Sequence, residues 1–305
     1  MPGAAPLLTD IASFPQGGEA CFLSPDTGVE IRAARWADGA RGTVFVLPGR
    51  TEYVEKYDLT IGWLIGLGYS VVCVDWRGQG LSTRAGGTKL GHVKRYAEFQ
   101  RDLDAVLDWC ADLPAPRYAL CHSMGGLIGL RALIRGLPFE RAAFCGPMWG
   151  LNLRPVQHVL GPFAMRFLAA IGRGMAEAPG ARRTDPAAQK LFEINPLTTD
   201  PDRFRSNRAQ VERHPELSLG PPSVGWLTAS FDEMTAVADA PAPETPALVF
   251  VGTDERVVSQ GAIMTQGERM AEATVIRMEG GRHELLQERP AIRDAIRARI
   301  EGFFA

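Results

Sequence analysis

The 305-residue chain has no uninterrupted apolar run of the length, about 18 residues, that a membrane-spanning helix needs. The longest candidate, residues 61–74, is interrupted by glycines and a serine, so it is better interpreted as a helix end, a turn and a strand. Residues 1–15 also lack the basic segment and apolar core of a signal peptide. We therefore expect a cytoplasmic protein without a membrane span.

The chain also lacks a large excess of either charge. Its formal net charge is −2, which gives no electrostatic reason to expect a nucleic-acid partner. The five cysteines are odd in number, and Cys73, Cys121 and Cys145 lie in apolar strand-like runs. This usage predicts reduced, buried thiols, as is typical of a cytoplasmic protein.

Signals for cofactors are absent as well. No cysteine–histidine spacing resembles a metal site. A dinucleotide site needs the full G-x-G-x-x-G set at the start of a helix that directly follows a strand. The Gly-x-Gly segments at 66–68 and 78–80 do not meet these requirements. The sequence therefore predicts neither a metal nor a cofactor.

What is present is an alternation of apolar strand-like and helix-like segments in a chain of ordinary globular composition. It predicts an α/β fold with a mostly parallel sheet of about eight strands and helices on both faces. The predicted strands lie near 19–24, 28–36, 43–47, 70–74, 117–121, 142–145, 247–251 and 274–278, and the predicted helices near 55–67, 93–111, 124–135, 258–271 and 290–304.

The strand rhythm is lost over residues 148–225, which are rich in proline, arginine and short apolar helical patches. We interpret this segment as a helical lid inserted into a core made of residues 1–147 and 226–305. Residues 156–171 place apolar side chains at helical spacing, flanked by Arg154, Arg166 and Arg173. Such a stripe usually packs on the domain below; the alternatives are an acyl-chain wall or a surface for transient membrane contact.

The most informative motif is Cys121-His122-Ser123-Met124-Gly125-Gly126, between a short apolar strand and an apolar helix. It nearly matches the G-x-S-x-G nucleophile elbow, with a cysteine at the first glycine position. The elbow needs small residues there because strand and helix pack closely. The simpler alternative is that Ser123 only caps a helix.

A nucleophilic serine needs a base, and the base needs an orienting carboxylate. Of five histidines, His283 follows a strand and a Gly-Gly turn and precedes the last helix, where the base is expected. For the acid, Asp254 follows the preceding strand and is our candidate, with Glu255 as its nearest rival. The order Ser123, Asp254, His283 is that of an α/β-hydrolase.

The oxyanion of such a reaction needs two donors. We predict the backbone N–H groups of Met124, after the nucleophile, and of Arg50, in the loop after strand 43–47. The Arg50 side chain could meet a phosphate or carboxylate, although pairing with Glu52 or Glu55 is the simpler interpretation. The predicted substrate-binding residues are Gly49, His122, Phe163 and Phe167.

Together these residues resemble the α/β-hydrolase family, and within it the serine aminopeptidase S33-like group of lysophospholipases and monoacylglycerol lipases. The resemblance covers nearly the whole chain, with Pro48-Gly49 where many relatives have His-Gly. The similar segments are residues 47–53, 75–82, 121–126, 252–258 and 281–284, together with 195–200 in the lid.

This resemblance implies hydrolysis of a carboxylic ester in a single-acyl lipid, either a lysophospholipid or a monoacylglycerol. The residues by themselves imply only acyl transfer to water. Two alternatives stay open: another α/β-hydrolase reaction, such as peroxidase-type or carbon–carbon cleavage chemistry, and a non-catalytic binding protein on the same scaffold.

Overall fold

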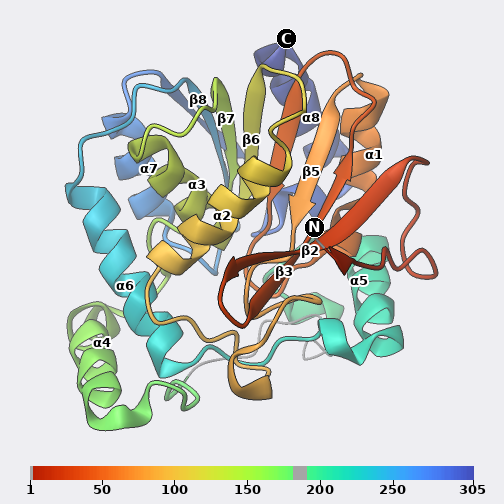
Figure 1. Cartoon of the computed structure of the whole chain (residues 1–305). Coiled ribbons are helices and arrows are strands. Elements are labelled where there is room, and N and C mark those ends of the chain that lie inside the picture. The colour runs from red at the N-terminus through yellow and green to blue at the C-terminus, as the bar shows by residue number, and fades with distance from the viewer. Residues whose placement is uncertain (1–2, 181–190) are drawn as a thin grey trace.

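The computed structural model describes residues 3–180 and 191–305. Their strands form a nine-stranded sheet in the order β1-β2-β3-β5-β4-β6-β7-β8-β9 (Figure 1). The pairs from β1 to β5 are antiparallel, and those from β5 to β9 are parallel. The strands are β1 (Gly3–Ala4), β2 (Gly18–Asp26), β3 (Val29–Trp36), β4 (Thr43–Leu47), β5 (Ser70–Val74), β6 (Arg117–His122), β7 (Arg141–Cys145), β8 (Ala247–Gly252) and β9 (Ala273–Met278).

The predicted α/β fold is confirmed, and each predicted strand has a counterpart in the sheet. The added strand, β1, has two residues and pairs with β2. Every residue of β4, β5 and β8 is buried, as expected of parallel strands that are covered on both faces. This burial explains why these strands appear in the sequence as short apolar runs without polar alternation.

The two faces of the sheet carry different helices and two separate hydrophobic clusters. Side chains of α2, α3, α6 and α7 pack on one face, and those of α1 and α8 on the other. The longer helices are α1 (Asp58–Gly66), α2 (Ala97–Trp109), α3 (Met124–Ile134), α4 (Pro155–Leu168), α5 (Pro201–Arg213), α6 (Val224–Asp239), α7 (Gln260–Arg269) and α8 (Pro290–Phe304).

The segment between β7 and β8 contains α4, α5 and α6 and adds no described strand to the sheet. In Figure 1, α4 and α5 lie below the sheet, whereas α6 rises along its left side. Since α6 returns to pack against α3, the chain re-enters the core close to residue 225. The division into a core and a lid over 148–225 stays a prediction.

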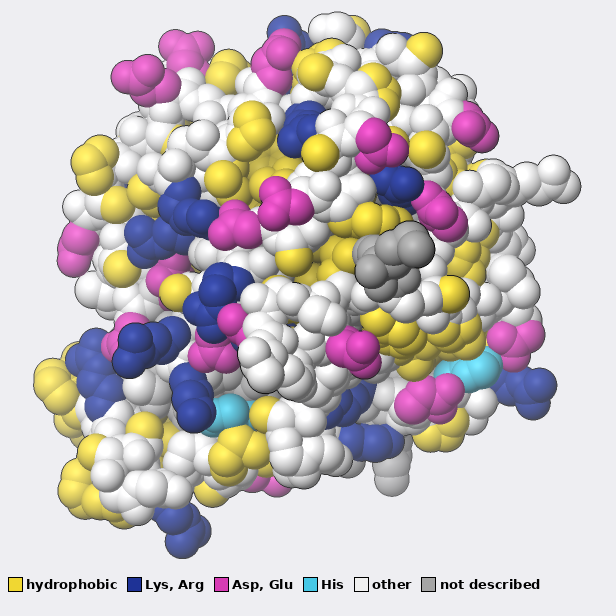
Figure 2. Space-filling view, viewed as in Figure 1, with side chains coloured by type: hydrophobic (Ala, Val, Ile, Leu, Met, Phe, Trp, Pro, Cys, Tyr) yellow, Lys and Arg dark blue, Asp and Glu magenta, His cyan; other side chains and the backbone are white. Residues whose placement is uncertain are grey.

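The apolar stripe of this segment lies on the outside. Within α4 only Met165 is buried, whereas Phe163 is 67% exposed and Phe167 is 64% exposed. Figure 2 shows apolar side chains gathered at the lower left, where α4 lies in Figure 1. The interpretation that this stripe packs on the domain below is therefore wrong.

No helix within residues 3–180 and 191–305 combines the length and the apolar character that crossing a membrane requires.

Candidate active site

Ser123 occupies a sharp turn between β6 and α3. Its φ of 49° and ψ of −115° are unusual for a residue with a side chain. Such strain persists only where the surroundings enforce it, and it is common at functional residues. A Cβ at Gly125 would lie 2.0 Å from the carbonyl oxygen of Leu47, so the turn requires a glycine at that position.

The cysteine at the first elbow position is accommodated by a glycine in the next helix. Cys121 is fully buried, and a Cβ built at Gly129 of α3 would lie only 2.6 Å from its Sγ. The extra volume of Cys121 therefore occupies the space that a side chain at position 129 would need. This exchange explains how the elbow keeps its close packing without its usual glycine.

Two hydrogen bonds connect the serine to a histidine and a carboxylate. The Nε2 atom of His283 lies 2.9 Å from Ser123 Oγ, and its Nδ1 atom lies 2.7 Å from Glu255 Oε2. Because an ionised carboxylate only accepts hydrogen bonds, the proton of the neutral ring belongs on Nδ1. Nε2 is then left as the acceptor for the serine proton, as nucleophile activation requires.

The structure corrects the predicted acid by one residue. Asp254 is exposed, while its neighbour Glu255 is buried and contacts His283. The backbone N–H of Asp254 donates to the carbonyl of Gly281, so this turn is hydrogen-bonded to the loop that carries His283.

Glu255 is held as a charged acceptor by its surroundings. Burial raises the pKa of its carboxyl group, but the nearby His283 ring and the N–H groups of Val257 and Val258 outweigh this and lower the pKa below its ordinary value. These N–H groups donate to Oε1 at 2.6 and 3.2 Å. Oε2 therefore stays available for the histidine.

The loop after β4 approaches the nucleophile closely. A Cβ at Gly49 would lie 3.0 Å from Ser123 Cβ, so the absence of a side chain lets the Gly49–Arg50 backbone reach the serine. Trp76 and Gln79 hold this loop by donating to the carbonyls of Pro48 and Gly49 at 2.9 and 2.7 Å.

Met124 is the first residue of α3, and N–H groups in a first helical turn have no partner within the helix. The two predicted oxyanion donors thus belong to segments that flank Ser123.

The Arg50 side chain donates to backbone carbonyls, which differs from the expected pairing with Glu52 or Glu55. Its Nη2 atom donates to the carbonyl of Gly220 at 2.7 Å and to that of Leu90 at 3.3 Å. Its guanidinium carbon also lies 5.2 Å from the ring centre of Trp226. Arg50 therefore ties the oxyanion loop to the segment between β7 and β8.

Three of the predicted substrate-binding residues lie where direct substrate contact is not supported. His122 is buried, and both of its ring nitrogens are engaged by other groups of the protein. Phe163 and Phe167 face outward, so they do not form a wall beside Ser123. Gly49 is the one of the four predicted residues whose backbone adjoins the Ser123 side chain without being engaged elsewhere by its own side chain.

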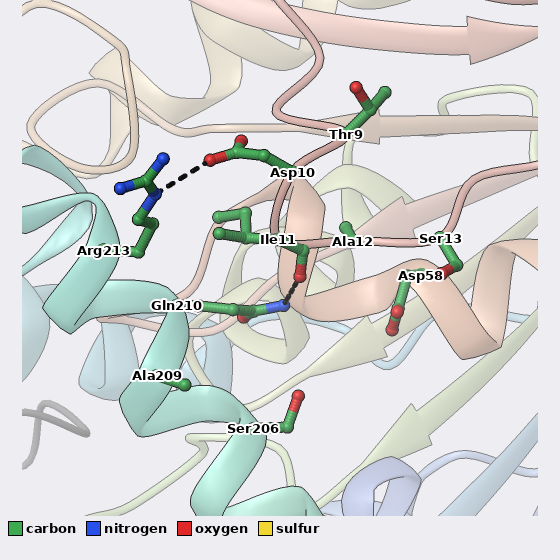
Figure 3. Close-up of a pocket in the computed structure, with 10 residues that line it drawn as sticks. All are labelled: Thr9, Asp10, Ile11, Ala12, Ser13, Asp58, Ser206, Ala209, Gln210 and Arg213. Atoms are coloured by element: carbon green, nitrogen blue, oxygen red, sulfur yellow. Dashed lines mark hydrogen bonds and ion pairs between the residues drawn. The ribbon is translucent and has the colours of Figure 1, made fainter.

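A polar pocket of about 480 Å³ lies elsewhere, between the N-terminal segment and α5 (Figure 3). Its lining includes Asp10, Asp58, Gln210 and Arg213, and none of the residues of the serine relay. Across it, Arg213 pairs with Asp10, and Gln210 donates to the carbonyl of Ile11. It is therefore a separate feature of the surface.

Among the residues that the structure describes, no group of three or more His, Cys, Asp or Glu side chains is arranged to hold a metal ion.

Comparison of the sequence with known proteins shows which family it resembles. A family model described as serine aminopeptidase, S33, matches residues 38–290. The chain is 32% identical to lysophospholipase L2 of Escherichia coli, over 97% of this chain and 89% of that protein. It is 24% identical to a probable lysophospholipase L2 of Haemophilus influenzae, over 86% and 83% of the two chains.

Solved structures show the same fold. A soluble variant of the Saccharomyces cerevisiae monoglyceride lipase, in complex with a substrate analogue, superposes with a TM-score of 0.73 at 16% identity, covering 98% of this chain and 99% of that one. A carboxyl esterase of Bacillus coagulans in complex with glycerol gives 0.75 at 19% identity, covering 95% and 98%. These identities support a shared α/β-hydrolase fold and no finer likeness.

Proposed function

The chain belongs to the serine aminopeptidase S33 family, and we propose that it is a serine hydrolase that cleaves carboxylic esters of single-acyl lipids. The observation that carries the proposal is the buried relay from Ser123 through His283 to Glu255. A non-catalytic scaffold has no need for a strained serine hydrogen-bonded to an oriented imidazole.

The proposed reaction begins when His283 Nε2 accepts the proton of Ser123 as Oγ attacks the ester carbonyl. Glu255 keeps the ring in the required tautomer and stabilises the imidazolium that forms. His283 then gives the proton to the leaving alcohol, which departs and leaves an acyl-serine. A water molecule, deprotonated by His283, hydrolyses that ester and releases the fatty acid.

The negative charge on the carbonyl oxygen is held by the backbone N–H groups of Met124 and Arg50. Donors of this kind contribute about 3 kcal/mol each to lowering the barrier. The Gly49 backbone is part of the substrate-facing wall of this site, since it adjoins the Ser123 side chain.

The substrate class is supported by the lysophospholipase relative, which matches most of both chains. The test is a hydrolysis panel in which one enzyme preparation meets lysophospholipids, monoacylglycerols and short nitrophenyl esters. We expect the highest kcat/KM on a single-acyl lipid, and none of these activities in Ser123→Ala. Activity confined to short esters would contradict the lipid assignment while leaving the esterase assignment intact.

Other α/β-hydrolase chemistry is the second candidate, because a bromoperoxidase of Bacillus anthracis shares the fold with a TM-score of 0.58. Product analysis separates the two reactions. Ester hydrolysis releases equal amounts of fatty acid and alcohol, whereas halide oxidation would consume peroxide without an ester.

We also propose that the outer face of α4 contacts lipid surfaces transiently, within a lid that spans residues 148–225. This face carries large exposed apolar side chains, and residues 153–175 contain three arginines and no acidic residue. One of the three, Arg166, pairs with Asp232 of α6. Apolar area beside positive charge favours the surface of an anionic bilayer.

The test is co-sedimentation with phosphatidylglycerol vesicles, with phosphatidylcholine vesicles as the neutral comparison. A Phe163→Ser/Phe167→Ser variant should bind anionic vesicles about tenfold more weakly, because two large apolar side chains no longer enter the lipid. Leu59→Ser, at an exposed leucine of α1, is the matched control and should bind as the unmodified protein does. Equal binding by all three proteins would contradict this contact.

Finally, we propose a cytoplasmic location, which the cysteines support. All five are free and buried, as suits a reducing compartment.

A further inference from the structure

A buried group of charged side chains lies beside the relay and takes no part in the reaction described above. It contains Glu52, Lys56, His122 and Glu284, each almost fully inaccessible to solvent. Lys56 Nζ lies 2.9 Å from Glu52 Oε1 and 2.6 Å from Glu284 Oε1. Removing four ionisable groups from water costs free energy, which is offset only when the charges are well paired and hydrogen-bonded. So costly an arrangement suggests that these four residues have a role beyond stability.

The ring of His122 stands at the centre of this group and is held at both nitrogens. Nδ1 lies 2.9 Å from Glu52 Oε2, and Nε2 lies 3.1 Å from the backbone carbonyl oxygen of His283. A carbonyl oxygen only accepts, so Nε2 carries a proton.

Glu52 Oε2 also receives the N–H of Gly49 and, at 2.6 Å, the hydroxyl of Tyr57. An oxygen with that many donors is an ionised carboxylate, so His122 Nδ1 is protonated too. His122 is therefore an imidazolium with two donated hydrogen bonds.

Glu52 and His122 join three segments that the reaction needs in register. Through Gly49, Glu52 holds the oxyanion loop after β4. His122 is the residue before the nucleophile at the end of β6, and through its Nε2 it holds the backbone of the base-bearing loop after β9. These segments are far apart in sequence, and the paired side chains of Glu52 and His122 connect all three of them at one point.

We propose that His122, held by Glu52, is a positioning residue that sets the place of His283 relative to Ser123 and the oxyanion loop. The inference rests on the proposed serine hydrolase function and goes beyond it, since neither side chain touches the reacting atoms. An error of about 1 Å in the position of a catalytic group lowers turnover by about a hundredfold, so the bond from His122 to the His283 carbonyl matters for kcat.

Two isosteres of histidine separate the bonds at its two nitrogens. In His122→Gln, the side-chain amide reaches the position of Nε2 and keeps a donor for the His283 carbonyl. In His122→Asn, the shorter amide keeps a donor near Nδ1 for Glu52 and loses the bond to His283. Both variants replace the charged ring by a neutral amide, so each is a matched control for the other.

The assay is kcat and KM on a soluble short nitrophenyl ester, with the melting temperature measured alongside. We expect His122→Asn to lose about 10- to 100-fold in kcat with KM within about twofold. We expect His122→Gln to keep a kcat at least tenfold above that of His122→Asn. Equal kcat in the two variants, whether high or low, would overturn the proposal, because the bond to His283 would then not be the decisive one.

A measurement on the unmodified protein covers the case in which either variant fails to fold. His122 Nε2 should show the ¹⁵N chemical shift of a protonated nitrogen at pH 7. An unprotonated Nε2 would overturn the proposal, because it could not donate to the His283 carbonyl. Ser123→Ala separates this inference from the function on which it rests. If that variant keeps its esterase activity, the serine hydrolase function fails; if it loses the activity and the histidine variants are equal, only the positioning role fails.

Discussion

Replacing Glu255 by glutamine removes one charge from the relay and changes little in its shape. The carboxylate lies 2.7 Å from His283 Nδ1 and is fully buried, so water does not screen the pair. With about 4 Å between charge centres and an effective dielectric constant of about 20, the carboxylate stabilises the imidazolium by about 4 kcal/mol. Since about 1.4 kcal/mol is a factor of ten in rate, Glu255→Gln should lower kcat by about a thousandfold.

The matched control is Asp254→Asn, one residue earlier in the same turn. Its side chain is exposed, and kcat should stay within about twofold of the unmodified enzyme. The assay is initial-rate hydrolysis of a soluble nitrophenyl ester, with burst titration to count active sites. The reasoning would be refuted if Asp254→Asn lost activity by orders of magnitude and Glu255→Gln did not.

Three further perturbations test the packing, the electrostatics and the loop. Gly129→Ala should lower the free energy of unfolding by about 1–3 kcal/mol through overpacking. The loss should be much smaller in a Cys121→Ala background, because the added methyl group clashes with Cys121 Sγ. Equal losses in the two backgrounds, measured by denaturant unfolding, would refute this packing argument. Burial lowers the pKa of His122, but Glu52 raises it overall above its ordinary value. This contribution to stability is therefore full below about pH 6.5 and is lost as pH rises through the raised pKa. The melting-temperature advantage over His122→Gln should shrink accordingly between pH 6 and 9, and a constant difference would contradict it. Gly49→Ala should lower kcat about tenfold or more by displacing the oxyanion loop, measured on folded protein; unchanged kcat would show that the loop has room.

Much of the fold was predictable from the sequence because its parallel strands are short and wholly apolar. The run 247–251, for example, is bounded by prolines and a glycine, and the structure has β8 at Ala247–Gly252. The two-residue β1 was not predictable, since so short a strand has no alternation to detect. The exposure of the apolar stripe of α4 was not predictable, because periodicity shows that a helix has an apolar face and does not show what covers that face.

The residues of the candidate active site were also predictable only in part. The sequence indicated Ser123 and His283 through turn chemistry and chain order, and the structure brings the two side chains together. It favoured Asp254 over its neighbour Glu255, whereas Glu255 contacts His283 in the structure, because the chain order predicts which turn carries the acid and not which of two adjacent side chains faces the ring. Glu52 left a fainter signal as an acidic residue three positions after Gly49, within reach of that backbone N–H.

The central claim is that Ser123 is the nucleophile, and one measurement tests it most directly. The folded protein is treated with a fluorophosphonate, digested, and analysed by mass spectrometry to locate the added phosphonyl group. The account predicts a single modification, on Ser123, that is lost on prior denaturation and proceeds in step with the loss of esterase activity. Full inactivation with the label on another residue, or retained activity with Ser123 labelled, would contradict it.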